Sequence, residues 1–265
     1  MRNLIFKNRF KLTLCLSFIL CISLQAQDKT IGSGTVTASG TGKTKHKIML
    51  IPFENRMYMS EIDFLINKES KLNAKQIKAL MRDGLNEQLY KKLKSKMAVV
   101  DLLDDTVKTQ KDLKRIYQYV SYQYQQVPNQ DNYKAPAKEK EKKGIEKGQL
   151  NVESNSDARF MNAKLQNATL VPYLYAKYKT DLYLFINELD LKALNGPAAD
   201  MGLNSSRKII MHYTVYTYDA KEINSGIAEV ELPANVNNPT RIINSYFSRL
   251  ADIVSARIEK CTAVK

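Results

Sequence analysis

The sequence predicts a single α/β domain in which a mixed sheet of about five strands is covered by two long amphipathic helices, plus a helical and disordered insertion. Two short, continuous apolar runs in the first half have the composition of strands that are buried on both faces. Segments in the second half alternate with a period of two and are rich in β-branched and aromatic residues. Two long segments repeat apolar residues at intervals of three and four, so each presents a stripe that needs a sheet to cover.

The first half of the domain is predicted to form a strand, a helix and a second strand. Residues 47–53 and 97–103 are the two apolar runs, and residues 72–96 form the helix between them. Asn73 and Gln76 stand three residues apart at the helix start, which is the spacing of a capping box. The apolar stripe of this helix consists of Ile77, Leu80, Met81, Leu85, Leu89 and Leu93.

Residues 104–179 are predicted to be an insertion in this domain. Apolar residues return at helical spacing over residues 105–126, and a short helix is expected at 157–167. Between them, residues 128–156 combine prolines with a mixed-charge run and few large apolar groups. Such a segment cannot bury enough surface to offset its chain entropy, so it is predicted to be a disordered linker.

The second half is predicted to form three strands and a final helix. The strands lie at 181–189, 207–218 and 223–232, and a turn at 219–222 joins the last two into a hairpin. The helix covers 239–259 and has a proline at its first position, where a missing N–H costs nothing. Its apolar stripe consists of Ile242, Ile243, Tyr246, Phe247, Leu250, Ile253, Val254 and Ile258.

Residues 1–26 have the layout of a secretory signal peptide. A basic start without acidic residues precedes an apolar run at 12–24 and a small-residue exit. The run is shorter than the roughly 20 residues that a membrane span needs, which favours cleavage over an uncleaved anchor. Residues 27–46, rich in Gly, Ser, Thr and Lys, are predicted to be a flexible leader before the domain at 47–262. We therefore expect an exported protein of the periplasm or the outer-membrane periphery, with secretion as the alternative.

The chain is strongly basic, with a formal net charge of +14. Four of the 41 Lys and Arg lie in the predicted signal peptide, which leaves 37 basic against 27 acidic residues after it. Such a balance favours an anionic partner, whereas lysines scattered among acidic residues are also typical of an ordinary solvated surface.

The motifs of common enzymes and metal sites are not found in the sequence. Residues 40–44 resemble the end of a phosphate-binding loop, but Thr37 replaces its first glycine and a strand follows instead of a helix. Cys261 is the one cysteine after the signal, so no internal disulfide is expected. His46 and His212 are far apart and lack the spacing of a zinc site, and His212 is expected to point outward from its strand. We therefore expect no cofactor, no metal and no catalytic residue.

A dense polar cluster follows directly after the first buried strand. Ligands of open α/β sheets gather beyond the carboxyl ends of the strands, so this cluster is the predicted partner site. Its arginine can pair with an anionic group, its tyrosine can stack or donate, and its acidic side chains can bind a basic partner or a hard cation. The alternative is a capping and salt-bridging loop in which Ser60 opens a short helix. The candidate binding residues are Glu54, Asn55, Arg56, Tyr58, Glu61 and Asp63.

A second cluster consists of tyrosines that lie beside lysine and glutamine in the insertion. Aromatic side chains among basic residues can stack on bases or sugars. Two of the tyrosines fall on the apolar stripe of the predicted helix, so packing explains them, and the others are candidates for a partner surface. The cluster consists of Tyr117, Tyr119, Tyr122, Tyr124 and Tyr133.

The strand signature at 47–55, the helix after it and the strand that follows resemble the opening of a group of envelope domains. These are the periplasmic domain of CsgG-type curli secretion channels, the LpoB-type outer-membrane activators and the amino-terminal domain of TolB. The order of elements in the second half agrees, so the resemblance covers residues 47–103 and 180–259. It implies an α/β domain that acts as an adaptor or assembly part, although the chain lacks the lipid-attachment cysteine of many such proteins. The signal exit and composition also resemble exported proteins of Bacteroidetes-type bacteria.

These features together predict a non-enzymatic periplasmic or envelope-associated adaptor that binds a protein partner or an anionic envelope polymer. Two other functions remain open. One is an exported hydrolase with a carboxylate site near Glu61 and Asp63, and the other is a basic polyanion or nucleic-acid binder that uses the tyrosine-rich insertion. Nucleic acid is the less expected ligand, membrane contact is expected to be peripheral, and an oligomer is compatible with the sequence.

Overall fold

The structure is a computed structural model, and the part of the chain that it describes belongs to one compact unit, Gly42–Lys265. The predicted signal peptide, the leader up to residue 45 and nearly all of the predicted linker at 128–156 lie outside this part. The described residues are 46–104, 106–128, 130, 145–146, 149–150, 159–193 and 206–263.

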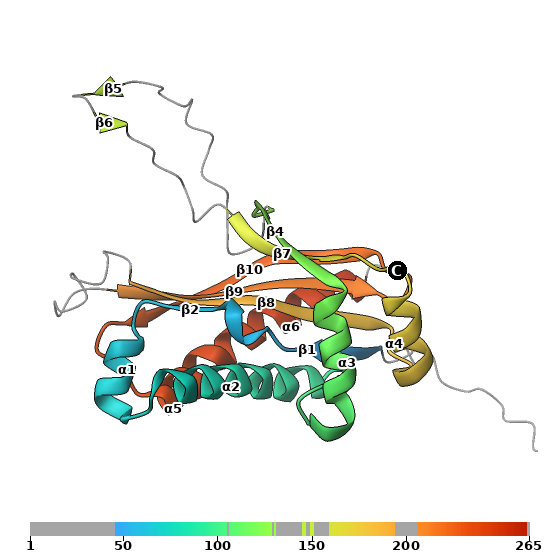
Figure 1. The fold of residues 1–265 in the computed structure, drawn as a ribbon, viewed down its shortest axis with the longest axis horizontal. Helices are drawn as coiled ribbons and strands as arrows, with labels where there is room; N and C mark the ends of the chain where they lie inside the picture. Colours follow the sequence, from blue (N-terminus) through green and yellow to red (C-terminus); the bar gives the residue numbers. More distant parts are fainter. Residues whose placement is uncertain are drawn as a thin grey trace, which may run out of the picture. The chain divides into compact units, whose positions relative to one another are not determined.

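A mixed six-stranded sheet forms the centre of the fold and confirms the predicted fold class (Figure 1). Its strands lie in the order β10, β9, β8, β1, β3, and β2 pairs with the far half of β8. The pairs β1–β3, β1–β8 and β2–β8 are parallel, whereas β8–β9 and β9–β10 are antiparallel. The strands are β1 (Lys47–Ile51), β2 (Tyr58–Ser60), β3 (Ala98–Asp101), β8 (Leu182–Ala193), β9 (Ser206–Thr217) and β10 (Glu222–Pro233).

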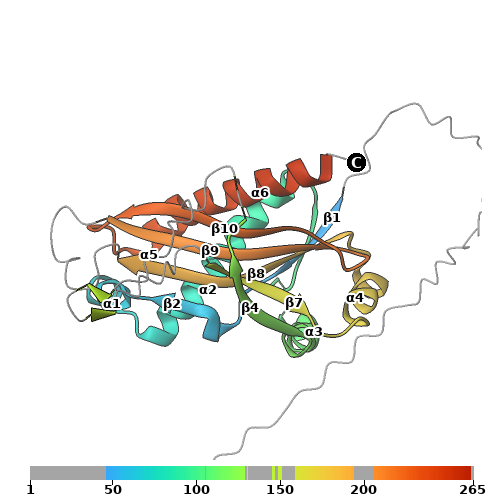
Figure 2. The same cartoon turned by 90° about the horizontal axis from the view of Figure 1, so that it is seen from above.

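Two long helical segments cover one face of this sheet, as the apolar stripes predict. The first is α2 (Ala74–Lys94), whose capping box between Asn73 and Gln76 is formed in both directions. The second begins at α5 (Pro239–Arg241), passes through a π-helical stretch at Ile242–Phe247 and continues as α6 (Ser248–Ala263). Figure 2 shows α6 running along β9 and β10. The short helix α1 (Asp63–Ser70) packs beside α2 and begins three residues later than the predicted opening at Ser60. Among the described residues, no helix is both long enough and apolar enough to span a bilayer.

The opposite face of the sheet is covered by two helices and a separate pair of antiparallel strands. The helices are α3 (Thr106–Gln118) and α4 (Leu170–Tyr178), and the strands are β4 (Val120–Gln126) and β7 (Arg159–Leu165). Buried Asp112 ties the two helices together, since its carboxylate accepts hydrogen bonds from the hydroxyls of Tyr173 and Tyr178 and from Lys177 Nζ. A further short pair, β5 (Ile145–Glu146) and β6 (Gln149–Leu150), lies in the insertion.

Two predictions for the insertion are wrong. The predicted helix at 105–126 ends at Gln118 and is followed by β4, and the predicted helix at 157–167 is the strand β7. Residues 122–125 alternate tyrosine and glutamine with a period of two, which favours a strand once a partner is present. Tertiary pairing between β4 and β7 therefore overrides the weak helical spacing.

The outer edge of β7 is bound by side chains of the main sheet instead of by another strand. The Met161 N–H donates to His212 Nδ1 at 2.7 Å, and the Ala163 N–H donates to Thr214 Oγ1 at 3.2 Å. The carbonyls of the same two residues accept from Asn187 Nδ2 at 2.8 Å and from the Tyr216 hydroxyl at 2.9 Å. Four backbone groups that an edge strand leaves unpaired are thus satisfied.

The close contact between α2 and the π-helical stretch predicts the effect of a single substitution. A Cβ at Gly84 would lie 2.6 Å from Ile243 Cδ1, so Gly84→Ala forces the whole isoleucine side chain to move. Overpacking of this kind costs about 1–3 kcal/mol, which outweighs the gain of roughly 1 kcal/mol from the better helix former. We expect a lower free energy of unfolding in urea for Gly84→Ala.

A double variant controls for this interpretation. Ile243→Ala alone opens a cavity, but in combination with Gly84→Ala it also removes the clash. The double variant is therefore expected to lose less free energy of unfolding than the two single losses added together. If the losses of unfolding free energy in the two single variants simply add, the contact between Gly84 and Ile243 does not limit the packing of α2.

Candidate functional site

A β-bulge in β8 places a row of polar side chains on the β4–β7 side of the sheet. The register between β8 and β9 shifts between Ile186 and Glu188. Before the shift, Leu184 and Ile186 pack in the core beneath α2 and α6, and after it Leu189 and Leu191 do so. The alternation has changed from even to odd positions, so Glu188 and the residue two positions on face the other way. Bulges re-aim side chains in this manner.

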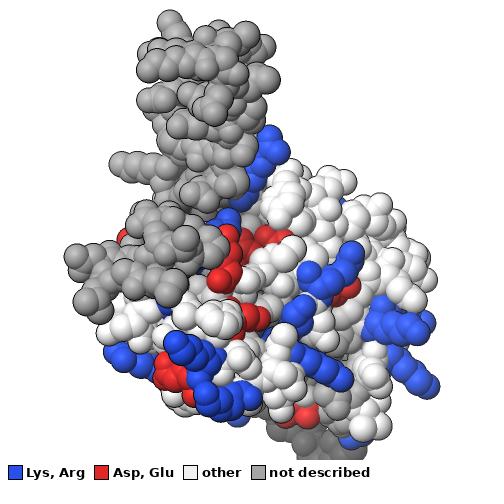
Figure 3. Space-filling view, turned by 60° about the vertical axis from the view of Figure 1, so that its left-hand side comes forward, with Lys and Arg blue, Asp and Glu red and all other residues white. Residues whose placement is uncertain are grey.

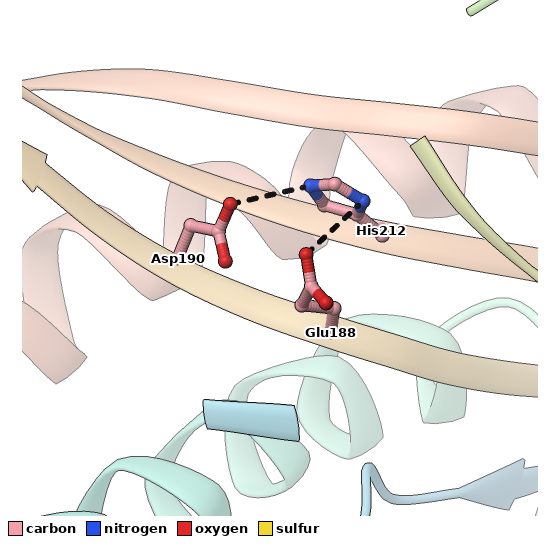
Figure 4. Close-up of side chains that lie close together, drawn as sticks. All are labelled: Glu188, Asp190 and His212. Atoms are coloured by element: carbon pink, nitrogen blue, oxygen red, sulfur yellow. Dashed lines mark ion pairs between the residues drawn. The ribbon is translucent and has the colours of Figure 1, made fainter. Parts of the chain in front are cut away.

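Three ionisable side chains meet on this face, beneath the β4–β7 pair. Glu188 and Asp190 project from β8 toward the ring of His212 on β9, one toward each nitrogen (Figure 4). Glu188 Oε1 lies 3.8 Å from His212 Nδ1, and Asp190 Oδ2 lies 3.6 Å from Nε2. The residues are 1%, 4% and 3% exposed, respectively. We call Glu188, Asp190 and His212 the buried triad.

The surroundings of the buried triad provide one cation and one hydroxyl. Lys192 Nζ lies 3.5 Å from Asp190 Oδ2, and the Tyr124 hydroxyl on β4 lies 3.2 and 3.3 Å from the two Glu188 oxygens. Asp190 Oδ1 is buried and makes no hydrogen bond. Among the described residues, the two carboxyl groups thus have one ammonium beside them, and one of their oxygens has no hydrogen-bond donor.

Burial shifts the pKa values of all three groups toward the neutral forms. It raises the pKa of Glu188 to about 7, with the neighbouring charge of Asp190 as the second cause. Burial also raises the pKa of Asp190, although Lys192 opposes this rise. The pKa of His212 falls to about 3, because burial and then the charge of Lys192 disfavour the imidazolium. At neutral pH the imidazole is therefore uncharged.

The hydrogen bonding of His212 decides whether the buried triad suits a metal ion. The ligand atoms of the three side chains lie within 4.8 Å of one another. However, Nδ1 accepts the Met161 N–H, which places the proton of the neutral ring on Nε2, facing Asp190. A histidine that binds a metal donates its second N–H to an acceptor, and here that nitrogen faces a donor. Together with the ammonium of Lys192, this arrangement does not fit a cation, and it favours a proton on the carboxyl pair.

The comparisons with known proteins identify no family for this chain. No protein-family model matches it, and no curated protein matches it. A crystal structure of lipoprotein GNA1162 from Neisseria meningitidis is similar to it, with 11% sequence identity and a TM-score of 0.29. The alignment covers 82% of this chain and 99% of that one. A likeness at this level carries no conclusion about the present protein.

Four of the predicted binding residues are paired with one another. Arg56 donates from Nε to Glu54 Oε2 at 2.9 Å and from Nη2 to Oε1 at 3.2 Å. The Tyr58 hydroxyl donates to Asp63 Oδ1 at 2.6 Å, and burial together with Asp63 raises the pKa of Tyr58. These pairs resemble the salt-bridging loop that the sequence offered as the alternative. Whether a partner binds there stays a prediction.

The other two predicted residues lie in the same segment. Glu61 Oε2 accepts the Ala193 N–H at 2.8 Å, which joins the end of β2 to the end of β8. Asn55 is exposed and begins a short 3-10 turn.

The structure brings the tyrosine cluster next to this polar segment. Arg56 lies over the ring of Tyr122, with its guanidinium carbon 6.0 Å from the ring centroid. The Tyr117 hydroxyl donates to the Pro52 carbonyl at 2.6 Å and accepts from Arg82 Nη2 at 3.1 Å. Tyr117 and Tyr122 of the tyrosine cluster therefore lie beside the polar segment beyond the end of β1, whereas Tyr124 contacts Glu188 and is 55% exposed. Tyr133 lies outside the described residues.

The buried triad was not predicted from the sequence. The prediction that His212 points outward to solvent is wrong, because β7 lies over that position and buries the ring. One signal was available for the bulge, since Asn187 and Glu188 are consecutive polar residues between an apolar run at 182–186 and an alternating segment at 188–192. Consecutive polar residues favour a bulge, but they do not show what covers it.

The shifts in the pKa values of Glu188 and His212 have opposite effects on the pH dependence of stability, and single variants separate them. The raised pKa of Glu188 lets the folded state hold a proton between pH 4.5 and about 7 that the unfolded state has lost, so stability falls as pH rises. The lowered pKa of His212 has the opposite effect between about 3 and 6.5, where only the unfolded state is protonated. Where the two windows overlap, their slopes of about 1.4 kcal/mol per pH unit oppose each other.

We therefore expect Glu188→Gln to become more stable as pH rises from 4.5 to 6.5, and His212→Gln to become less stable. Urea unfolding of both variants and of the wild type over this range measures the slopes. Glutamine at 212 retains an oxygen that can accept the Met161 N–H, which makes it the matched change. Parallel profiles for all three proteins would contradict the opposed titrations.

Proposed function

We propose that this chain is an exported, non-enzymatic adaptor or assembly protein of the cell envelope, and that it binds a partner protein. The layout of residues 1–26 supports export. The resemblance of residues 47–103 and 180–259 to the CsgG, LpoB and TolB envelope domains supports an adaptor role. The proposal places the partner on the segment Asn55–Ser70, which includes β2 and α1.

The main observation behind this proposal is that exposed apolar side chains in that segment stand on a backbone held in place by polar hydrogen bonds. The side chain of Phe64 is 75% exposed, more than any other aromatic side chain in the described residues, and Met59 is 51% exposed. The hydrogen bonds of Tyr58 to Asp63 and of Glu61 to Ala193 hold the backbone around them. Aromatic and methionine anchors within a polar rim are typical of protein interfaces.

The distribution of charge favours a protein over an anionic polymer as the partner. On the face drawn in Figure 3, the Lys and Arg side chains form separate groups, and acidic side chains lie among them. Lys68 on α1 lies close in sequence to Glu61 and Asp63, so the proposed segment itself has mixed charge. A surface that tracks a polyanion needs a continuous basic stripe.

Site-specific crosslinking tests the proposal. A photoreactive amino acid at position 64 is expected to capture one recurrent envelope protein in intact cells of the source organism. The matched control is position 107, because Val107 is 85% exposed but lies on α3, away from the proposed segment. Equal capture at both positions, or none at 64, would contradict the proposal.

A surface substitution gives an independent check. Phe64→Ser is expected to abolish co-purification of the captured protein and to change the free energy of unfolding by less than about 0.5 kcal/mol, since the side chain is exposed. Binding of an anionic polymer would instead survive this substitution and fall steeply with added salt as counterions are released.

A further inference from the structure

We propose that Glu188 and Asp190 form a proton-linked latch that holds the β4–β7 pair on the main sheet. The latch is closed while the two carboxyl groups hold one proton between them and loosens when that proton leaves. It concerns the interior of the protein and stands apart from the proposed partner surface.

The position of the buried triad supports this inference. Its carboxyl groups come from the main sheet, whereas two of its hydrogen bonds come from the pair that lies over it. One is the bond from the Tyr124 hydroxyl on β4 to Glu188, and the other is the bond from the Met161 N–H on β7 to His212. The cluster therefore joins two layers of the fold.

The unpartnered Asp190 Oδ1 shows where the shared proton belongs. In the described part of the chain this oxygen has no hydrogen-bond partner, and a protonated Glu188 beside it can supply one, since hydrogen bonding to Asp190 is among the causes that raise the pKa of Glu188. With that hydrogen bond the pair has one negative charge, which Lys192 balances from 3.5 Å. Every carboxyl oxygen of the pair then has a hydrogen-bond or ion-pair partner, and the net charge of the pair together with Lys192 is close to zero.

Loss of the proton leaves two buried carboxylates beside one ammonium. In the part of the chain that the structure describes, the charged and titratable groups that face the pair are Lys192 on the same strand, His212 on β9, Tyr124 on β4 and, at longer range, Glu61 after β2. His212 stays neutral, and the tyrosine pKa is raised to about 12, so neither supplies a compensating charge. The second negative charge is relieved only if water reaches the pair.

The β4 side of the cluster is the place where water can enter. Tyr124 is 55% exposed and its hydroxyl donates to Glu188, so this side chain is the exposed neighbour past which water can reach the carboxyl pair. At this end of the β4–β7 pair the apolar cluster is small and consists of Val127, Phe160, Ile210 and Ile227, whereas Val120 and Ala163 hold the other end in a larger core cluster. Loosening at the small cluster breaks fewer apolar contacts than separating the whole pair from the sheet.

Amide hydrogen exchange of the full-length protein tests the latch. We compare protection of residues 120–126 and 159–165 at pH 6 and pH 8.5, each corrected for the intrinsic pH dependence of exchange. In the wild type, protection of both strands is expected to fall at least about tenfold, the equivalent of one pKa unit. Protection in β1 and α2 is expected to stay constant. A uniform fall across all elements, or no fall, overturns the proposal.

Two variants separate the latch from general alkaline loosening. Glu188→Gln keeps the shape of the side chain without the titration, so protection of β4 and β7 is expected to be independent of pH. Glu229→Gln is the matched control on β10, where the side chain pairs with Lys208 away from the buried triad, and it is expected to behave as the wild type. Retention of the wild-type pH response in Glu188→Gln overturns the proposal.

A direct titration covers the case in which Glu188→Gln fails to fold. Carbon-13 NMR of the glutamate carboxyl groups in the wild type is expected to show one resonance whose titration midpoint lies well above the usual pH of 4.5. In Asp190→Asn, where the neighbouring charge is removed, the midpoint of this resonance is expected to fall. A wild-type spectrum in which every glutamate titrates near 4.5 overturns the latch.

Discussion

Side chains of the main sheet form the hydrogen bonds that satisfy the outer edge of β7. These hydrogen bonds hold the β4–β7 pair on the face of the main sheet. A strand with a free edge exposes backbone donors and acceptors, and burying them without partners costs about 1–3 kcal/mol each. His212, Thr214 and Tyr216 stand at alternate positions of β9 and therefore point to the same side. With Asn187 they replace a neighbouring strand for Met161 and Ala163. The β4–β7 pair can thus lie on the sheet face without extending the sheet.

The same arrangement explains why polar groups are buried at this point. An apolar sheet face could not bond the edge of β7, so β8 and β9 present polar residues there. The bulge at Glu188 then turns two carboxyl groups into the space beside His212. The ring of His212 therefore has two different neighbours. Its Nδ1 accepts a hydrogen bond from the backbone of β7, and its Nε2 faces the carboxyl group of Asp190. This division of roles excludes the ring as a metal ligand and leaves the carboxyl pair to hold a proton.

The predictability of each element follows the range of the interactions that form it. The helices α2 and α6 were predictable because their stripes and caps are local, as the Asn73–Gln76 box shows. The π-helical stretch at Ile242–Phe247 was not predictable, since its apolar spacing is compatible with both an α-helix and a π-helix. β7 was missed because its stability comes from side chains some fifty residues away in the chain, such as Thr214. The polar segment after β1 could be predicted from its position at the end of a buried strand. Prediction of the buried triad would have required both the bulge in β8 and the placement of β7 over His212.

The central position of β1 has a consequence for the order in which the chain folds. Its two neighbours in the sheet are β3, which follows after β2, α1 and α2, and β8, next to which Asp181 accepts a hydrogen bond from the Lys47 N–H across 134 positions of sequence. β1 is therefore half-paired until most of the chain is available. A chain that enters a compartment from its N-terminus would present β1, α2 and β3 as an incomplete apolar layer during that interval. Long-range closure of this kind is slow, so the early half of the protein would need protection from proteases and from other chains before β8 arrives.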